Sequence, residues 1–449
     1  QYIFFGCFVV IRKSDFKNGF FIKYSNIFFI THYNLYYINI VVYTEMSKVY
    51  LFHISLQHAS ETCIGLQKNA LLDTFATTRF LIKNQFPYNL RNFFPKFVSQ
   101  RIKTKSNKYV KKKYVKLFGL YDWIETIVKH LFKLHLSYRF GDIGYNYFSN
   151  KVIKDIGKKK IKLVWGYNNY SLKVFEYAKS KNIFVILDLS IGHILELEKV
   201  KNKFDPYGNL NYGITDNIIS RQLAEIKIAD KIIVGSKFVA KTLLKHGVPS
   251  KKIIIQNYGF NEKLFLKKDL KIRKILKNEP LELLFVGQIN TRKGADILIN
   301  VVKDFSPEKV NLTMIGNYFL EIDRKKLPKN ISIINHLPRY KLKKYFYSSH
   351  AFCFPTHFEG SALTIYESIG SGLPVITTPE SGHNIKGIGN FEIKSNSKSQ
   401  LKNLLNKFFK DKNLITKMSK NIINQYDNNK WSSYHDNIEK ITKKILIKN

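Results

Sequence analysis

The sequence predicts an α/β protein built from two parallel-sheet domains, and three observations support this. Its 449 residues correspond to two or three domains at roughly 100–200 residues each. Hydrophobic residues make up 45% of the chain and charged residues 24%, which excludes a disordered or collagen-like chain. From Met46 onward, short β-branched runs alternate with helical patterns, which is typical of parallel sheets covered by helices.

The first alternating series spans residues 46–264 and predicts an N-terminal domain. Its expected strands are Val49–Ser55, Lys162–Trp165, Phe184–Leu189, Lys231–Val234 and Ile253–Gln256. Its expected helices are Leu172–Ala178, Ile214–Ala229 and Lys237–Lys245. Residues 1–45 are dense in Phe, Tyr and Ile without any periodicity, so we expect the native protein to begin at Met46. A membrane-associating extension is the alternative for those first residues.

A lysine-rich stretch at 265–280 predicts a linker, and a second alternating series at 281–425 predicts a C-terminal domain. Its expected strands are Leu281–Val286, Asn311–Ile315, Ile331–Ile334, Ala351–Phe354 and Pro374–Thr377. Apolar residues recur on one face of Ala295–Phe305, which predicts a helix. Residues 426–449 predict a final helix that packs back on the N-terminal domain.

The charge balance is strongly basic, because 74 Lys and Arg residues stand against 33 Asp and Glu, a net charge of +41. Such a field attracts nucleic acid, an anionic membrane face or phosphorylated substrates. Lysine is frequent in nearly every segment, so a codon bias explains the charge equally well. A nucleic-acid-binding protein needs a binding module or one focused basic face, and we expect no nucleic-acid partner.

The cysteines and the apolar runs bear on location. Cys7, Cys63 and Cys353 lie far apart, which disfavours a disulfide framework or zinc site and favours a reducing, cytoplasmic compartment. No apolar run reaches the ~18–20 residues of a membrane span. The basic, aromatic segment Phe97–Phe118 suits an anionic membrane surface, at ~1 kcal/mol per basic residue, or a solvated loop and helix face.

Two motifs in the second half carry chemistry. The first, from Phe285 to Gly294, is a strand that runs through Gly287 into a loop bearing Arg292 and Lys293 ahead of a helix. Backbone N–H groups and cations at a helix N-terminus predict a phosphate site. A plain strand–loop–helix turn with surface charges is the alternative.

The second motif presents Glu359 in a loop and then opens a helix at Gly360 and Ser361. Ser361 is expected to be the N-cap, so that free N–H groups receive a diphosphate. Glu367 follows six residues later, about 9 Å along a helix axis, where a carboxylate meets ribose hydroxyls. Glu359 is expected to face the hydroxyls of a sugar. Two surface carboxylates on one helix are the alternative.

These motifs resemble the family-4 glycosyltransferases of the GT-B fold, which has two facing Rossmann-like domains and a cleft between them. The resemblance runs from Glu225 to Pro379. It rests on five ordered motifs: Ala229-Asp-Lys-Ile-Ile-Val-Gly-Ser, Gly247-Val-Pro, Leu284-Phe-Val-Gly…Arg-Lys-Gly294, Glu359…Glu367 and Gly372-Leu-Pro-Val-Ile. His336-Leu-Pro-Arg is similar to a further landmark of the family.

The resemblance implies roles for the motif residues. Lys293 would neutralise the donor diphosphate, Glu367 would hold the ribose, and Glu359 would contact the transferred sugar. Gly287 and Arg292 belong to the phosphate loop, and Gly360 and Ser361 would supply backbone donors. His193 follows a first-domain strand where the family often places a histidine near the sugar, and a loop histidine without that role is the alternative.

Two departures from the family pattern concern the donor loop and the first loop. Gln288 stands where the family usually has Arg, so Arg292 would have to replace that charge. The glycine-rich first loop is missing, and residues 57–63 read Gln-His-Ala-Ser-Glu-Thr-Cys instead.

The resemblance also implies a reaction: transfer of a sugar from a UDP- or GDP-sugar with retention of configuration, to a glycan or lipid-linked acceptor. Synthesis of cell-surface polysaccharide or lipopolysaccharide at the inner membrane face is the expected setting. The sequence contains no D-x-D spacing, so we expect no metal requirement, and no cofactor is implied. A nucleotide-sugar epimerase or a non-catalytic GT-B protein is the alternative, and a nucleic-acid-binding protein is the remote one.

Overall fold

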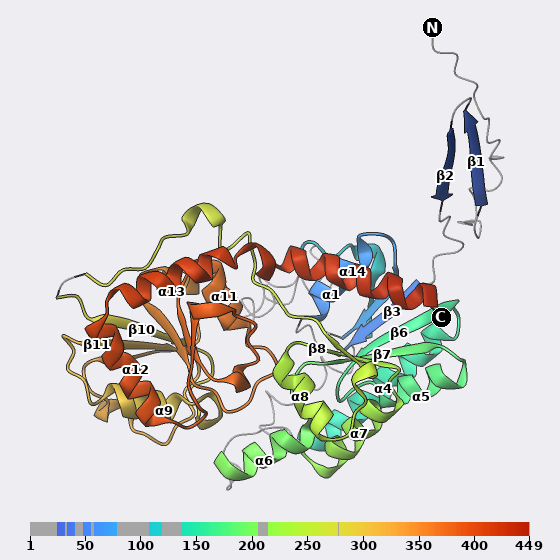
Figure 1. Cartoon of the computed structure of the whole chain (residues 1–449). Coiled ribbons are helices and arrows are strands. Elements are labelled where there is room, and N and C mark those ends of the chain that lie inside the picture. The colour runs from blue at the N-terminus through green and yellow to red at the C-terminus, as the bar shows by residue number, and fades with distance from the viewer. Residues whose placement is uncertain are drawn as a thin grey trace, which may run out of the picture.

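The computed structural model describes residues 25–31, 34–40, 48–54, 58–78, 107–118, 137–204, 214–276 and 278–448. Two α/β domains lie side by side, each with one parallel sheet covered by helices (Figure 1). Strands β1 (Ser25–Thr31) and β2 (Asn34–Ile40) pair with each other as a separate antiparallel sheet. Met46, the expected start of the protein, lies outside the described residues.

The N-terminal domain has a sheet of order β5-β4-β3-β6-β7-β8-β9, in which every pair is parallel. Its strands are β3 (Lys48–His53), β4 (Leu72–Thr77), β5 (Val115–Leu117), β6 (Ile161–Tyr167), β7 (Phe184–Leu189), β8 (Lys231–Val234) and β9 (Ile253–Ile255). Its helices are α1 (Ala59–Gln67), α4 (Ser137–Ile156), α5 (Leu172–Ser180), α6 (Ile194–Phe204), α7 (Asp216–Ile228) and α8 (Lys237–Lys245).

The C-terminal domain has a second parallel sheet, of order β12-β11-β10-β13-β14-β15. Its strands are β10 (Leu281–Val286), β11 (Val310–Ile315), β12 (Ile331–Ile334), β13 (Ala351–Phe354), β14 (Val375–Thr377) and β15 (Asn390–Glu392). Its helices are α9 (Ala295–Val302), α10 (Arg339–Ser348), α11 (Leu363–Ser371), α12 (Lys398–Lys410) and α13 (Asn413–Asn424). The order of each sheet reverses beside its first strand, where α/β proteins bind ligands.

The predicted α/β class with two parallel-sheet domains is confirmed. Most expected elements agree with the structure to within two residues, and the differences have local causes. Helix α7 begins at Asp216 because the Thr215 side chain accepts a hydrogen bond from the backbone of Ile218, at 3.3 Å, and so acts as the N-cap. Helix α9 ends at Val302, and the chain then turns instead of continuing to Phe305.

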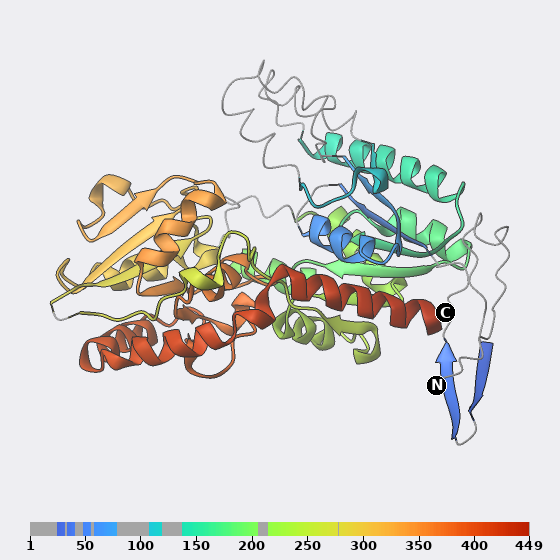
Figure 2. The same ribbon diagram turned by 90° about the horizontal axis from the view of Figure 1, so that it is seen from above.

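Helix α14 (Trp431–Lys448) leaves the C-terminal domain and packs on α1 of the N-terminal domain (Figures 1 and 2). Gly65 permits this packing, because a β-carbon there would lie 3.0 Å from the carbonyl oxygen of His435. The Thr62 and Tyr434 hydroxyls meet between the two helices at 2.8 Å. The final helix therefore ties the two domains together.

The stretch expected to be a linker packs against the C-terminal domain. Arg273 is buried, and its guanidinium donates to the carbonyl oxygens of Phe346, at 3.1 Å, and Ser371, at 2.9 Å. Phe265 packs edge-on against Phe346, with 5.7 Å between the ring centroids. Burial of this stretch fixes where the second domain begins.

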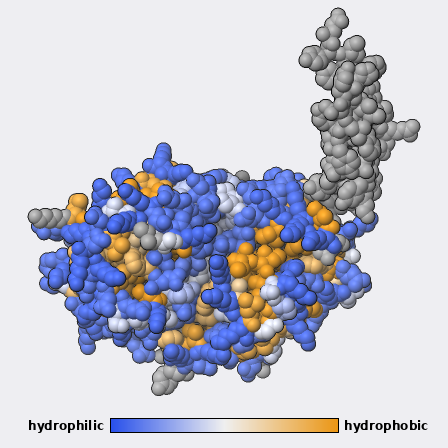
Figure 3. Space-filling view, in the orientation of Figure 1, coloured by the Kyte–Doolittle hydropathy of each residue, from blue (hydrophilic) through white to orange (hydrophobic). Residues whose placement is uncertain are grey.

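The surface of the described residues is mostly hydrophilic on the face shown in Figure 3, with apolar residues in smaller patches. Within the described part of Phe97–Phe118, residues 107–118, the side chains of Lys111, Lys112 and Lys113 are exposed. The rest of that segment lies outside the described residues. Among the described helices, none is long and apolar enough to cross a membrane.

Candidate active site in the interdomain cleft

A cleft of about 710 Å³ separates the two domains. The N-terminal wall carries four polar residues, His58, Ser60, Glu61 and Asn107. The C-terminal wall is longer and contains Val286, Gly287, Gln288, Ile315, Gly316, Asn317, His336, Leu337, Pro338, Arg339, Leu342, Leu363, Thr364 and Glu367, and Trp431 also borders the cleft. The volume of the cleft lies in the usual range of pockets for small-molecule ligands.

Two glycines end neighbouring strands at this wall. Gly287 follows β10 and Gly316 follows β11, and both line the cleft. A β-carbon on Gly316 would lie 1.8 Å from the carbonyl oxygen of Gly287, so only glycine fits at position 316. The sequence analysis identified Gly287 but missed Gly316, although both directly follow a buried apolar strand. Together they leave the end of the sheet free of side chains.

The N-terminus of α11 also faces the cleft, although not as the sequence analysis expected. The helix begins at Leu363 after Ala362, which provides no side-chain cap. Ser361 is therefore not the N-cap, because its hydroxyl lies 2.9 Å from the Tyr366 hydroxyl and donates to the carbonyl oxygen of Gly382, at 3.1 Å. Leu363 and Thr364 line the cleft, and N–H groups in the first turn of a helix generally have no partner within it, although the N–H of Ile365 donates to the carbonyl oxygen of Ala362, at 3.0 Å. This end of α11 is suited to an anion.

Gly360 lies at the contact between the domains. A β-carbon at this position would stand 1.8 Å from the carbonyl oxygen of Ser190, which follows strand β7. Ser236, also from the N-terminal domain, donates to the carbonyl oxygen of Gly360 at 2.6 Å. Gly360 thus holds the carboxyl ends of the two sheets against each other.

Glu367 is buried in the cleft wall, beside Arg339. One of its oxygens lies 3.3 Å from the Arg339 Nε, and the Arg339 side chain is largely exposed. Burial raises the pKa of Glu367, and the positive charge of Arg339 opposes that rise. Because Glu367 lines the cleft, its carboxyl group can meet hydroxyl groups of a ligand there.

Arg292, Lys293 and Glu359 form one ion cluster. Glu359 accepts a hydrogen bond from Arg292 at 2.7 Å and also pairs with the Lys293 ammonium. The backbone N–H of Lys293 donates to the Asn290 side chain at 3.0 Å, which fixes the turn that carries both cations. None of the three lines the cleft cavity. Glu359, expected to face sugar hydroxyls, instead pairs with the two cations.

Burial controls the charges of this cluster. It lowers the pKa of Lys293 to about 8, against the opposing effect of Glu359. Burial also acts to raise the pKa of Glu359, but the charges of Lys293 and Arg292 outweigh it and hold that pKa below its ordinary value. With two cations and one carboxylate, the cluster carries one net positive charge when all three groups are ionised.

His193 lies away from the cleft, contrary to the expected position beside the sugar. Its ring stacks on His246 with 4.0 Å between the centroids, and both rings border a separate cavity of about 330 Å³. Burial and the neighbouring His246 lower the pKa of His193 to about 4. The backbone N–H of His193 donates to the Thr242 side chain of α8 at 2.9 Å.

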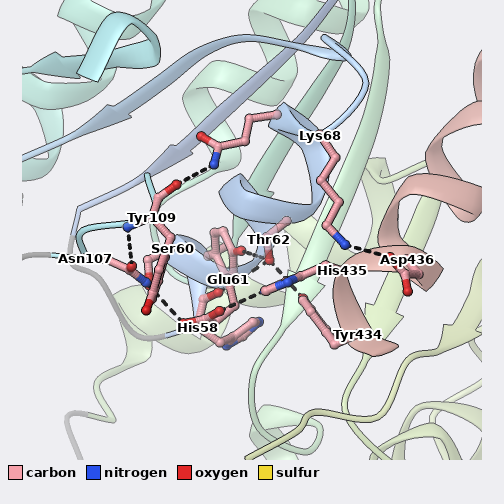
Figure 4. A network of polar contacts seen from close by, with 12 residues as sticks. His58, Ser60, Glu61, Thr62, Lys68, Asn107, Tyr109, Tyr434, His435 and Asp436 are labelled. Carbon is pink, nitrogen blue, oxygen red and sulfur yellow. Dashed lines mark hydrogen bonds and ion pairs between the residues drawn. The ribbon is translucent and has the colours of Figure 1, made fainter. Parts of the chain in front are cut away.

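The N-terminal wall holds polar residues to which the sequence analysis assigned no role. His58 lies 3.0 Å from Asp188, and both are buried. Glu61 accepts a hydrogen bond from Asn107 at 3.2 Å and lies 2.8 Å from His435 of α14 (Figure 4). At residues 57–63 the sequence indicated only that the family's glycine-rich loop is missing. Because 130 positions separate His58 from Asp188, no local pattern reveals the pair.

Gln288, which stands where the family usually has Arg, lines the cleft. Its side-chain oxygen accepts a hydrogen bond from Asn290 at 3.4 Å. Among the described residues, no three His, Cys, Asp or Glu side chains gather as a metal site requires.

Comparison with known proteins agrees with this geometry. The family model described as "Glycosyl transferases group 1" matches residues 267–425, which contain the whole C-terminal wall of the cleft. The chain is 29% identical over 211 residues to an "Uncharacterized 41.2 kDa protein in cps region" of Klebsiella pneumoniae, covering 46% of this chain and 54% of that protein. It is 27% identical over 200 residues to an "Uncharacterized glycosyltransferase" of Haemophilus influenzae, covering 42% and 51%. These alignments span about half the length of each relative.

Solved structures of low sequence identity share the two-domain fold. HepE of Anabaena in complex with UDP and glucose aligns with a TM-score of 0.59 at 12% identity, covering 89% of this chain and 100% of that one. WaaG, a glycosyltransferase involved in lipopolysaccharide biosynthesis, aligns with a TM-score of 0.56 at 14% identity, covering 88% and 99%. The fold is therefore GT-B. More particularly, residues 267–425 are similar to the group 1 glycosyltransferases, whose family model they match.

Proposed function

We propose that this protein is a retaining glycosyltransferase that moves a sugar from a UDP- or GDP-sugar to a glycan or lipid-linked acceptor. The observation that carries the proposal is the cleft itself, because one wall presents the α11 N-terminus, Gly287 and a buried Glu367. The group 1 domain over residues 267–425 supports the reaction class.

The donor would lie along the C-terminal wall. Its diphosphate would accept hydrogen bonds from the first turn of α11, where N–H groups and the helix dipole favour negative charge. The ribose hydroxyls would donate to Glu367, one helical turn further along the same helix. The glycine pair 287 and 316 would let the donor approach the sheet closely.

The ion cluster would act on the leaving group. As the bond to the anomeric carbon breaks, the diphosphate gains negative charge, and groups that bind this charge more strongly in the transition state lower the barrier. Lys293 and Arg292 are held ready by Glu359 with one net positive charge. None of the three lines the cleft in this structure, so a donor diphosphate would have to draw both cations away from Glu359, which would free the carboxylate to meet hydroxyls of the sugar.

The pathway and the location are parts of the same proposal. The relative from a cps region and the similarity in fold to WaaG support a role in cell-surface polysaccharide or lipopolysaccharide synthesis. We propose that the enzyme needs no metal or cofactor. We also propose that it acts in the cytoplasm, on the inner face of the membrane. Exposed Lys111, Lys112 and Lys113 suit an anionic membrane surface. Failure of the full chain to co-sediment with phosphatidylglycerol vesicles at low salt would overturn the membrane part.

The reaction is tested by nucleotide release. The full chain is incubated in EDTA with UDP-glucose, other UDP-sugars and GDP-sugars, together with a panel of nitrophenyl glycosides as acceptors. We expect one donor to release its nucleoside diphosphate and the product to keep the anomeric configuration of that donor. A donor converted to an isomeric nucleotide sugar, without any acceptor, would indicate an epimerase. No binding of any donor would favour a non-catalytic GT-B protein.

A further inference from the structure

A groove of about 430 Å³ lies on the C-terminal domain, apart from the interdomain cleft. The stretch before β10 forms one side of it and the start of α13 forms the other, on the outer side of the domain (Figures 1 and 2). Its lining includes Ile272, Lys274 and Leu276 from the first side and Lys412, Thr416 and Lys420 from the second. Among the described residues, none lines both this surface, here named the α13 groove, and the cleft.

The stretch before β10 turns a charged residue inward and apolar residues outward. Arg273 and Ile275 are buried, whereas the residues that alternate with them, Ile272, Lys274 and Leu276, are exposed. Such alternation is that of an extended chain with one buried face. Ile272 is 42% exposed and Leu276 is 65% exposed. Single exposed apolar side chains are ordinary, but these two border the same groove with a lysine between them.

Lysines supply the charge of the α13 groove. Lys274, Lys412 and Lys420 line it, and no aspartate or glutamate does so in the part of the chain that the structure describes. The Lys412 Nζ donates to the carbonyl oxygen of Leu276 at 2.8 Å, which ties α13 to the stretch before β10. Lys274 and Lys420 are exposed, one on each side. The groove therefore attracts anionic groups from both sides.

The carboxylates nearest in the sequence do not cancel this charge. Glu279 and Asp411 each accept a hydrogen bond at 3.0 Å from a nearby backbone N–H. Two further lysines, Lys271 and Lys417, are exposed and adjoin the groove residues in the sequence. Lysines thus outnumber carboxylates around the groove, and their field extends over about 8 Å at physiological ionic strength.

A bilayer with anionic phospholipids matches both properties of the α13 groove. Apolar side chains enter the acyl region of a bilayer while lysines next to them reach the headgroup phosphates. A nucleic acid or a sugar phosphate would meet the lysines but leave Ile272 and Leu276 in water. A second copy of this chain would bring lysines against lysines, which is unfavourable.

We propose that the α13 groove docks on a bilayer of anionic phospholipids. Ile272 and Leu276 enter the acyl region, and Lys274 and Lys420 contact the phosphate groups. This contact is additional to the one proposed for residues 111–113 of the N-terminal domain, and it does not depend on the sugar-transfer reaction. Two contacts hold the chain where one alone would give only marginal, reversible attachment.

Vesicle co-sedimentation tests the apolar part of the contact. The full chain is mixed with vesicles of phosphatidylglycerol and phosphatidylcholine in equal parts, and with vesicles of phosphatidylcholine alone. Leu276→Ser is expected to weaken binding to the anionic vesicles about 5- to 30-fold, because burial of most of a leucine side chain is lost. Ile447→Ser is the matched control, since Ile447 is 64% exposed and lies outside the groove. Equal binding by the wild type and Leu276→Ser would overturn the proposal.

Lysine variants test the charged part. Lys274→Gln and Lys420→Gln are each expected to weaken binding about fivefold, as loss of one basic residue near an anionic surface does. Lys303→Gln, exposed in the same domain but outside the groove, should bind like the wild type. High salt should remove the effect of Lys274→Gln and leave that of Leu276→Ser. A loss in Lys303→Gln as large as in Lys274→Gln would show that only the net charge matters, against the proposal.

Fluorescence tests insertion without removing an apolar side chain. Leu276→Trp is mixed with vesicles whose phosphatidylglycerol carries brominated acyl chains, which quench tryptophans that enter the acyl region. We expect more quenching than in the wild type, whose three tryptophans set the background, and no added quenching in Ile447→Trp. The absence of added quenching in Leu276→Trp would overturn the proposal even if the other variants fail to fold.

The outcomes separate this proposal from the proposed function. Binding that weakens only in the triple variant Lys111→Gln, Lys112→Gln and Lys113→Gln would overturn the role of the α13 groove and leave the other membrane contact intact. Dimerisation that Leu276→Ser abolishes, without any binding to vesicles, would assign the groove to a second copy and also overturn the proposal. Nucleotide release uses soluble donors and acceptors, so its failure would refute the reaction and not this contact.

Discussion

Gly360 in the C-terminal domain lies directly against Ser190 in the N-terminal domain, so closely that a β-carbon on Gly360 would stand 1.8 Å from the Ser190 carbonyl oxygen. The Ser236 hydroxyl donates to the carbonyl oxygen of the same glycine at 2.6 Å. The contact holds together the loops that follow β7 and β13, so the width of the cleft depends on it.

Gly360→Ala is expected to push the domains apart. The added methyl group collides with backbone, which cannot move aside as a flexible side chain can, and such overpacking costs about 1–3 kcal/mol of unfolding free energy. Small-angle X-ray scattering should show a larger radius of gyration than in the wild type. Gly247→Ala is the control for backbone strain alone, because Gly247 has a φ of +76° and a β-carbon there has no neighbour within 4 Å, so it should cost stability without changing the radius. An unchanged radius in Gly360→Ala would contradict the role of this contact.

Lys293→Ala is expected to slow turnover about 10²- to 10³-fold, as removal of one preorganised donor to a developing negative charge typically does. Arg292 still pairs with Glu359 in this variant, so no buried carboxylate is left without a partner. Steady-state kinetics with the bound donor measures the effect. The exposed Lys303→Ala serves as the control and should behave as wild type. Equal rates for Lys293→Ala and wild type would exclude a catalytic role for Lys293.

Glu367→Gln is expected to weaken donor binding about 10- to 100-fold, because hydrogen bonds to a charged group contribute about 1.5–3 kcal/mol. The amide has the same shape, and the raised pKa of Glu367 shows that burial already disfavours the charge, so the fold should persist. Isothermal titration calorimetry with nucleoside diphosphate compares the variant with the wild type. The same titration with Arg339→Gln tests the contribution of the Arg339–Glu367 ion pair separately. Unchanged affinity in Glu367→Gln would remove it from the ribose site.

Donor binding is expected to weaken as the pH rises through about 8. Burial lowers the pKa of Lys293 to about 8, so its ammonium is charged below that pH and neutral above it. Glu359 has a lowered pKa and stays ionised throughout this range, so the cluster loses its net positive charge. Affinity for nucleoside diphosphate measured from pH 6.5 to pH 9.5 checks this. Lys293→Arg should flatten the upper part of the profile, whereas the same decline in that variant would point to another group.

The fold and the donor wall were largely predictable because their signals are local. Buried strands are short apolar runs, and Gly287 and Glu367 belong to motifs whose spacing fixes their places on one wall. The N-cap of α11 was predicted wrongly at Ser361, because tertiary contacts to Tyr366 and Gly382 engage its hydroxyl. The local sequence does not predict such tertiary contacts.

The N-terminal wall was not predictable, because it is formed by contacts between segments that lie far apart in the sequence. His58 and Asp188 come from distant segments, and α1 packs closely on α14, where Thr62 meets Tyr434 from 372 positions further along the chain. His193 follows a strand as expected, but stacking on His246 turns its ring away from the cleft. A position in the sequence predicts where a loop lies better than where its side chain points.

The most direct test of the central claim is a thermal-shift screen of the full chain, in EDTA, against UDP-, GDP- and ADP-sugars. A ligand that binds only the folded state raises the melting temperature once its concentration exceeds Kd. The account predicts a concentration-dependent rise with one nucleotide class, reduced in Glu367→Gln. No rise with any nucleotide sugar, at millimolar concentration and with the fold intact, would contradict the claim that the cleft is a donor site.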